Sequence, residues 1–158
     1  MDAMPIIAIL LIGFSTGLRS FTSSAVLAWA ADLGRLSVGA TLFSFMASPI
    51  TAGVLTLFAL GEYVADLLPK TPSRTAAVGL IARFIMGTFA AGCIAAVSGR
   101  SLVLGLLGGI TAIGGAFAGY YARTGLVKSL NVKDPLIASP EDIAAVILAV
   151  ASVYLISA

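Results

Sequence analysis

Long apolar stretches separated by short polar segments run through the whole chain. Those long enough to cross a bilayer, which takes about 20 helical residues, cover residues 5–30, 49–68, 75–98, 101–123 and 141–157. The stretch at 37–47 is too short to cross and is predicted to form a short re-entrant or interfacial helix. The pattern predicts an all-α fold, a polytopic membrane bundle of about five transmembrane helices in a single integral domain, residues 1–158.

Helix starts are marked by a hydroxyl residue followed by proline. The pairs are Ser48-Pro49, Thr71-Pro72 and Ser139-Pro140. The hydroxyl oxygen can cap free amides, and proline fits the first helical turn. Helices are therefore predicted to begin at these pairs.

The first stretch is interrupted by a polar patch around Arg19, from Gly17 to Ser24. Hydroxyls and a guanidinium facing lipid would be left unpaired, which predicts a break or a water-lined face with Arg19 turned to the bundle interior. Alternatively, Arg19 marks a helix end and residues 21–30 form a separate short helix.

The composition excludes an ordinary soluble domain. The chain is 59% hydrophobic and 10% charged and lacks histidine, whereas soluble domains are roughly 25% charged. The net charge of +2 does not indicate nucleic acid as a partner. The basic residues instead serve as topology signals.

With five crossings, most basic residues fall on one side of the membrane. Lys70, Arg74, Arg123, Lys128 and Lys133 lie with the N-terminus, and Arg35 and Arg100 lie opposite. Because basic loops stay in the cytoplasm, the N-terminus is predicted to be cytoplasmic and the C-terminus external. Residues 123–142 are interpreted as a solvated cytoplasmic loop beside anionic lipid headgroups.

A shift of 91 positions aligns Ala47-Ser48-Pro49 with Ala138-Ser139-Pro140, and Gly17 with Gly108. This indicates an inverted repeat of the first two and last two stretches, a recurrent construction in transporters. Chance matches in a chain rich in alanine and glycine are the alternative. Glycines at helical spacing predict close helix packing, and residues 105–119 are also a candidate homodimer seam.

Two opposite charges, Glu62 and Arg83, flank the connection between the second and third stretches. At 1.5 Å per residue, Glu62 lies about 10 Å from Pro69, and Arg83 about 13 Å from Arg74. Adjacent antiparallel helices would bring them to similar depth, which predicts an ion pair. It is either a structural pair that fixes helix register or a carboxylate that changes protonation or cation occupancy during transport.

The candidate site gathers these charges with their polar neighbours. The predicted binding or transport residues are Glu62, Asp66, Arg19, Arg83, Ser20 and Thr22, and the predicted cytoplasmic mouth is Lys70, Arg74, Glu141 and Asp142. Asp66 is expected to pair with Lys70 or Arg74 at that mouth. Glu141 and Asp142 also suit a helix N-terminus, where the dipole favours negative charge.

Nothing in the chain points to an enzyme or to a cofactor. It has no histidine and a single cysteine, Cys93, and no phosphate-binding glycine loop. The carboxylates leave open whether the chain binds a metal ion.

Three short motifs carry a resemblance to a known family. Gly17-Leu18-Arg19-Ser20-Phe21, then Glu62-x-x-Ala65-Asp66-x-x-Pro69, then Glu141-Asp142 resemble the bacterial small-membrane-protein family called domain of unknown function 4126. The resemblance covers most of the chain. It implies a bacterial inner-membrane protein in which Arg19, Glu62, Asp66, Glu141 and Asp142 matter. Members of that family resemble one another in carrying a basic residue directly after the aspartate of the second motif, whereas Asp66 is followed here by Leu67.

Two functions follow as hypotheses. The first is a small multi-pass transporter or channel-like protein for a cation or a proton-coupled small solute. The spacing of Glu62, Asp66 and Lys70, loosely similar to the acidic signature of an inverted-repeat cation exchanger family, favours it. The second is a non-transporting scaffold or lipid-interacting protein whose buried charges are structural. Membrane lipid and a second copy of the chain are the expected partners.

Overall fold

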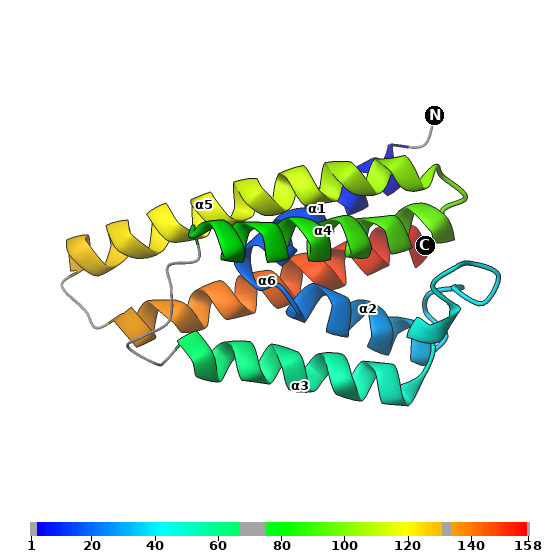
Figure 1. Ribbon diagram of the computed structural model, residues 1–158, viewed down its shortest axis with the longest axis horizontal. Coiled ribbons are helices and arrows are strands. Elements are labelled where there is room, and N and C mark those ends of the chain that lie inside the picture. The colour runs from blue at the N-terminus through cyan, green and yellow to red at the C-terminus, as the bar shows by residue number, and fades with distance from the viewer. Residues whose placement is uncertain (1–2, 67–74, 131–133, 158) are drawn as a thin grey trace.

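The computed structural model describes residues 3–66, 75–130 and 134–157, which form helices and no strand. The elements are α1 (Met4–Leu18), α2 (Thr22–Asp32), the short 3-10 helix η1 (Ser44–Met46), α3 (Pro49–Asp66), α4 (Ala77–Val97), the 3-10 helix η2 (Leu102–Leu104), α5 (Gly105–Leu130) and α6 (Asp134–Ser157). Figure 1 shows their arrangement. The predicted all-α bundle is confirmed.

The first apolar stretch does not cross the bundle, because the chain turns back between α1 and α2 (Figure 1). The Ser15 and Ser23 hydroxyl oxygens lie 2.8 Å apart, whereas eight residues of a continuous helix would span about 12 Å. The single crossing over residues 5–30 is therefore wrong. The alternative, a helix end at Arg19 followed by a separate short helix, is confirmed.

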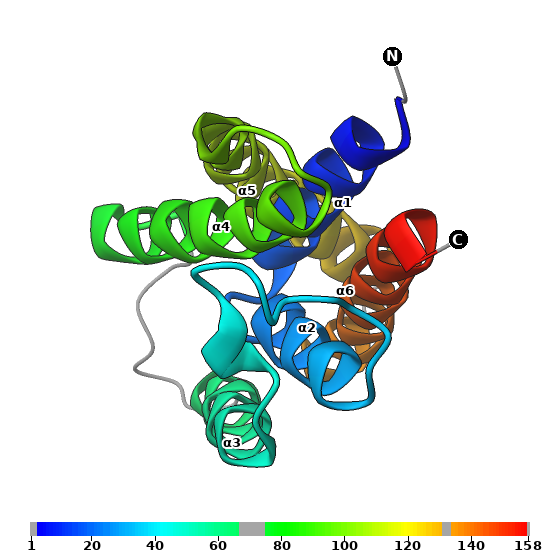
Figure 2. The ribbon, with the colours of Figure 1, turned by 90° about the vertical axis from the view of Figure 1, so that its right-hand side faces the viewer.

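This N-terminal hairpin, α1 with α2, forms the centre of the bundle. Helix α1 packs against α4, α5 and α6, and α2 packs against α3 and α6. The end-on view in Figure 2 shows the four longer helices around the hairpin. Ile9 and Ile12 of α1 and Leu27 of α2 are fully buried. The hairpin therefore supplies much of the core that the longer helices enclose.

Glycines let α1, α4 and α5 approach closely. A Cβ atom on Gly17 would lie 2.7 Å from the Gly115 Cα, and one on Gly108 would lie 2.6 Å from the Gly87 carbonyl oxygen. Separations this short are not tolerated, so only glycine fits, and the predicted close packing is confirmed. These glycines of α5 pack inside the chain, and a homodimer seam at residues 105–119 stays a prediction. Gly114 faces open space.

Both ends of the described chain lie at the same end of the bundle (Figure 1). Met4 and Pro5 line one cavity of about 1000 Å³ together with Leu155 and Ile156. We call this the terminal end. A bundle that crosses a membrane along its long axis would therefore have both termini on one side, which differs from the predicted opposite sides. The N-terminal hairpin begins and ends at the terminal end. The remaining long helices, α3 to α6, are even in number, so the chain finishes at the end where it began.

Among the described residues, three helical segments are long and apolar enough to cross a membrane, namely Ala77–Val97, Leu102–Ser129 and Pro140–Ser157. Helix α3, with 18 residues, runs beside them between the same two ends (Figure 1). Many of its large apolar side chains are exposed, among them Ile50, Leu57 and Val64. Exposed apolar surface on long helices is what a lipid environment requires.

Other sequence predictions meet mixed outcomes. Helix α3 begins at Pro49, as predicted, whereas Pro140 lies inside α6. Most of the segment 123–142, predicted to be a loop, is helical, since α5 continues to Leu130 and α6 starts at Asp134. Thr71-Pro72 lies outside the described residues. The stretch 37–47 contains only η1 and turns.

The two halves of the predicted repeat differ in fold. The first half begins with the hairpin, while its counterpart is the continuous helix α5. A break is missing where the repeat requires one, so the predicted inverted repeat does not describe this bundle.

Candidate functional site

The turn of the hairpin leaves two helix ends inside the protein. Arg19 is extended, with φ −142° and ψ 114°, and terminates α1, and α2 begins at Thr22. A helix end leaves carbonyl groups or amides without helical partners. Buried groups of this kind need other partners. Charged side chains from α3 and α4 provide them.

Glu62 of α3 caps the start of α2. Its two carboxylate oxygens accept hydrogen bonds from the backbone amides of Ser20, at 3.0 Å, and Phe21, at 3.2 Å. A negative charge at a helix N-terminus is favoured by the helix dipole. Glu62 therefore holds the second arm of the hairpin in place.

Arg83 of α4 caps the end of α1. Its Nε donates to the Gly17 carbonyl at 3.0 Å, and its Nη1 donates to the Gly79 carbonyl at 3.2 Å. Its Nη2 lies 3.7 Å from Oε1 of Glu62. The predicted ion pair is confirmed. Helices α3 and α4 are not the packed neighbours that the prediction assumed, because α3 packs on α2 and α4 on α5 and α1.

The Arg19 side chain ties the turn to two further helices. Its Nη1 donates to Asp66 of α3 at 2.7 Å, and its Nε donates to Asp142 of α6 at 2.6 Å. The guanidinium lies over the Tyr63 ring, 4.7 Å from its centroid, an arrangement that adds cation–π attraction. Arg19 is only 2% exposed. The predicted interior orientation of Arg19 is confirmed.

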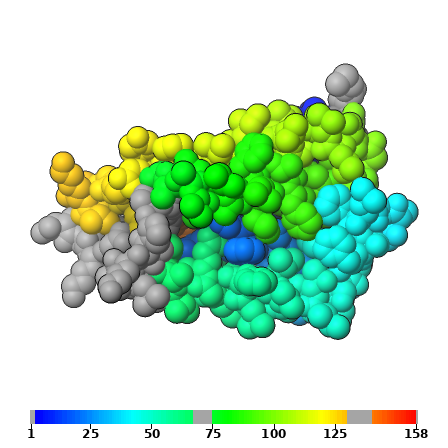
Figure 3. Space-filling view, in the orientation of Figure 1, coloured from blue at the N-terminus to red at the C-terminus, as the bar shows by residue number. Residues whose placement is uncertain are grey.

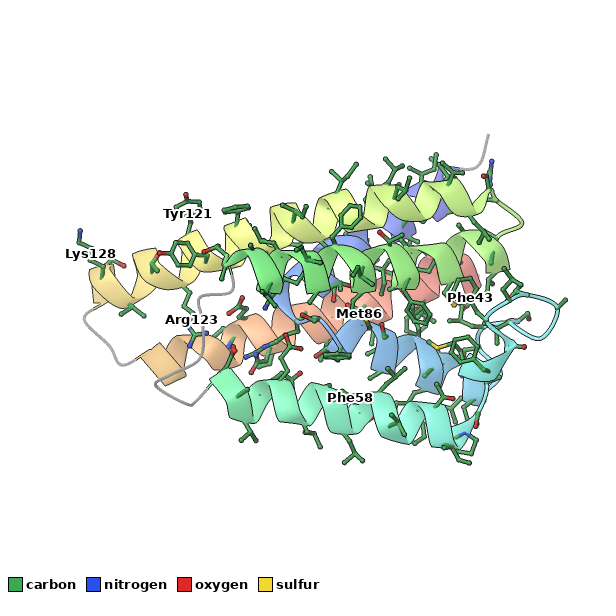
Figure 4. The ribbon with its side chains drawn as sticks, viewed as in Figure 1. Phe43, Phe58, Met86, Tyr121, Arg123 and Lys128 are labelled. Carbon is green, nitrogen blue, oxygen red and sulfur yellow. The ribbon has the colours of Figure 1, made fainter. Side chains whose placement is uncertain are left out.

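Arg123 of α5 completes the group, with Nη1 3.6 Å from Asp66 Oδ2. Figure 4 shows Arg123 extending from α5 towards α6. The charge cluster is thus Arg19, Arg83, Arg123, Glu62, Asp66 and Asp142. Its three arginines and three carboxylates balance in formal charge. It connects the hairpin to all four long helices.

Access to the charge cluster is unequal. Arg83 is 7% exposed, while the side chains of Glu62, Asp66 and Asp142 are 14%, 18% and 28% exposed. The space-filling view in Figure 3 shows a hollow between α3 and α4, with atoms of the hairpin in its floor. The carboxylates can therefore be reached, and so can Arg123, at 14% exposed, whereas Arg19 and Arg83 are enclosed.

The charge cluster lies at the tip of the N-terminal hairpin, at the end of α1 that points away from the termini (Figure 1). Helix α1 has 15 residues, which is about 22 Å, against about 30 Å for a bilayer core. If the first apolar stretch were one crossing helix, its middle residue would lie halfway between the two ends of that helix. In a hairpin, the middle residue lies at the turn, farthest from the end at which the chain enters. Arg19 therefore lies at the far tip of the hairpin, about 22 Å along α1 from its start.

The remaining predicted residues fall in different places. Ser20 contributes its backbone amide to Glu62, and the Thr22 hydroxyl lies 3.1 Å from the Tyr63 hydroxyl. Glu141 is half-buried and lines a cavity of about 290 Å³ with Arg123. Lys70 and Arg74 lie outside the described residues. Within the described ranges, no three His, Cys, Asp or Glu side chains gather as a metal site would require.

A family model matches residues 6–155, which include every member of the charge cluster. The chain belongs to the DUF4126 family. The family is described as a domain of unknown function. No curated protein and no solved structure matches the chain. For this member of the DUF4126 family, function must therefore be argued from the charge cluster.

In this DUF4126 protein the sequence did not single out Tyr63 or Arg123 as partners of the charge cluster, and it gave Asp142 a different role. Tyr63 carried no sequence signal beyond its place next to Glu62. Arg123 was interpreted as a loop residue, because the continuation of α5 to Leu130 was not predicted. Asp142 was placed at the mouth, whereas it contacts Arg19 directly. The helical course of the chain up to Leu130 and again from Asp134 explains the last two differences.

Proposed function

We propose that this protein is a small multi-pass membrane transport protein for a cation or a proton-coupled small solute, acting without an enzymatic step or a cofactor. The observation that carries the proposal is the turn of the N-terminal hairpin. There the end of α1 and the start of α2 are held by ionisable side chains from other helices. Interrupted helices with charged surroundings are a recurrent feature of transporter sites.

Glu62 provides a physical link between ion occupancy and backbone position. Its charge stabilises the start of α2 through two amides and attracts Arg83. A proton or a cation on this carboxylate would weaken both interactions, because both depend on the negative charge. The turn would then be free to move, which is the coupling that a transport cycle needs.

Flux measurements test this proposal. The purified protein is reconstituted in vesicles that contain a pH-sensitive dye, and proton, sodium or potassium gradients are imposed with and without a mixture of small solutes outside. We expect a gradient-dependent change of internal pH or of ion content with the wild type. Glu62→Gln should reduce it to the level of empty vesicles.

The matched control is Asp32→Asn, which neutralises a carboxylate at the last residue of α2, away from the charge cluster. Its flux should equal that of the wild type. Equal signals from wild-type, Glu62→Gln and empty vesicles under every gradient would refute the transport function.

A non-transporting scaffold or lipid-interacting role is the second candidate. The balanced charges of the cluster and its two buried arginines, Arg19 and Arg83, support it. Paired charges of this kind can serve structural specificity rather than turnover. In this case the charge cluster would fix the hairpin permanently between the four helices.

We further propose a bacterial inner-membrane location with both termini external. Arg123 and Lys128 lie in the part of α5 farthest from the termini, which we call the cluster end (Figure 4). In the sequence, Lys70 and Arg74 follow α3, and Lys133 follows α5. Arg35 and Arg100 belong to the terminal end. The excess of basic residues favours a cytoplasmic cluster end.

Single-cysteine labelling checks this orientation. In a Cys93→Ala background, Leu42→Cys reports on the terminal end, where Leu42 is exposed, and Lys128→Cys reports on the cluster end. A membrane-impermeant maleimide added to intact bacterial cells should label Leu42→Cys at once. Lys128→Cys should react only after permeabilisation. The reverse pattern would show that the termini are cytoplasmic.

A further inference from the structure

A groove between α2 and α6 opens at the terminal end, away from the charge cluster. Its volume is about 470 Å³. Val26 and Ala30 of α2 and Val150 and Val153 of α6 line its walls. These side chains offer no hydrogen bond, so the walls suit a hydrocarbon chain.

The rim of the groove carries aromatic side chains. Trp29 and Tyr154 both line it and are exposed, and the Trp29 indole donates to the Thr56 hydroxyl at 3.0 Å. Aromatic rings with a polar edge prefer the level of the lipid headgroups. The groove therefore runs from the apolar part of the bundle towards the level at which lipid headgroups would lie.

One charged residue, Arg35, lines the groove, and its backbone is fixed there. Gly34 has φ +71°, the left-handed conformation that glycine favours at a helix end. The Arg35 amide donates to the Ala30 carbonyl at 2.8 Å, and the Arg35 carbonyl accepts from the Ser157 hydroxyl at 2.9 Å. A cation is thus positioned at the polar end of an apolar groove.

The length of the groove matches part of an acyl chain. From Val150 to Ser157, α6 advances about 10 Å, which is long enough to accommodate part of an extended acyl chain. The groove combines apolar walls, an aromatic rim and a positive end in the order of the parts of an anionic phospholipid.

We propose that this groove binds an anionic phospholipid, with one acyl chain along the valines and the phosphate at Arg35. The single positive charge among the lining residues favours an anionic over a zwitterionic headgroup. A basic side chain near the membrane surface contributes enough to raise affinity for an anionic lipid about fivefold.

Trp29 is the sole tryptophan of the chain, so all tryptophan fluorescence comes from the rim of this groove. The full-length protein is reconstituted in phosphatidylcholine vesicles containing an equal fraction of either brominated phosphatidylglycerol or brominated phosphatidylcholine. Bromine quenches tryptophan on contact. We expect an association constant about fivefold higher for brominated phosphatidylglycerol, and a ratio near one for Arg35→Gln.

Two further variants make the result specific. Arg100→Gln removes the same charge from a residue that does not line this groove, and it should keep the wild-type preference. Val150→Phe fills the groove without adding a second tryptophan, and it should reduce quenching by both lipids.

Several outcomes would overturn the proposal. Equal quenching of the wild type by both lipids would mean that the groove does not select an anionic headgroup. Weak quenching by either lipid would mean that something else, such as a second copy of the chain, covers Trp29. Loss of preference in Arg100→Gln as much as in Arg35→Gln would assign the effect to general surface charge.

Discussion

Arg19→Met is expected to destabilise the protein by about 3–5 kcal/mol, the usual cost of removing one partner from a buried ion pair. Methionine leaves Asp66 and Asp142 without the guanidinium that both now contact, and it removes the cation from the Tyr63 ring. The measurement is the loss of helical circular dichroism as denaturing detergent is added to the protein in mild micelles.

Two variants control this experiment. Arg35→Met also removes an arginine, but from an exposed position, and should change the unfolding free energy by less than about 0.5 kcal/mol. Arg19→Lys keeps the charge but cannot reproduce the planar two-carboxylate contact, so it should recover only part of the loss. An Arg19→Met protein as stable as Arg35→Met would contradict the importance of this contact.

The second large effect concerns the pair that caps the hairpin. Glu62→Gln and Arg83→Met should each destabilise by about 3–5 kcal/mol, because each leaves a partner charge buried. The double variant should cost less than the sum of the two, by about 0.5–3 kcal/mol. The unfolding titration described for Arg19 measures all three free energies.

Full recovery in the double variant is not expected, because each side chain also caps a helix end. Glu62 holds the Ser20 and Phe21 amides, and Arg83 holds the Gly17 carbonyl. A lost cap costs about 1 kcal/mol. Additivity within about 0.3–0.5 kcal/mol would show that the two charges are not coupled. A folded double variant without cellular function would argue against the scaffold role.

The sequence allowed the fold class and the Glu62–Arg83 contact to be predicted. The fold class depends on apolar length, which is a local property of the chain. The contact was predicted by counting residues from the connection between α3 and α4 back to Glu62 and forward to Arg83. This count gives the position of each residue along its helix, whether or not the two helices touch. Arg19 was placed inside because an unpaired guanidinium in lipid is costly.

The course of the N-terminal hairpin could not be predicted in the same way. A break at Gly17 to Phe21 fits both a kinked crossing helix and a reversal, since both leave the same backbone groups unpaired. The reversal is decided by partners far along the chain, such as the Ala145 carbonyl that accepts from Ser15. The depth of Arg19, the position of the termini and the role of Asp142 all followed from that choice.

The N-terminal hairpin also has a consequence for biosynthesis. It is synthesised before the four long helices, yet the bonds that fix it join residues 123 and 130 positions apart, from Arg19 to Asp142 and from Ser15 to the Ala145 carbonyl. Contacts of such long sequence separation form late. The hairpin, which carries a charged residue in an otherwise apolar segment, can therefore reach its final position only after α6 has been synthesised.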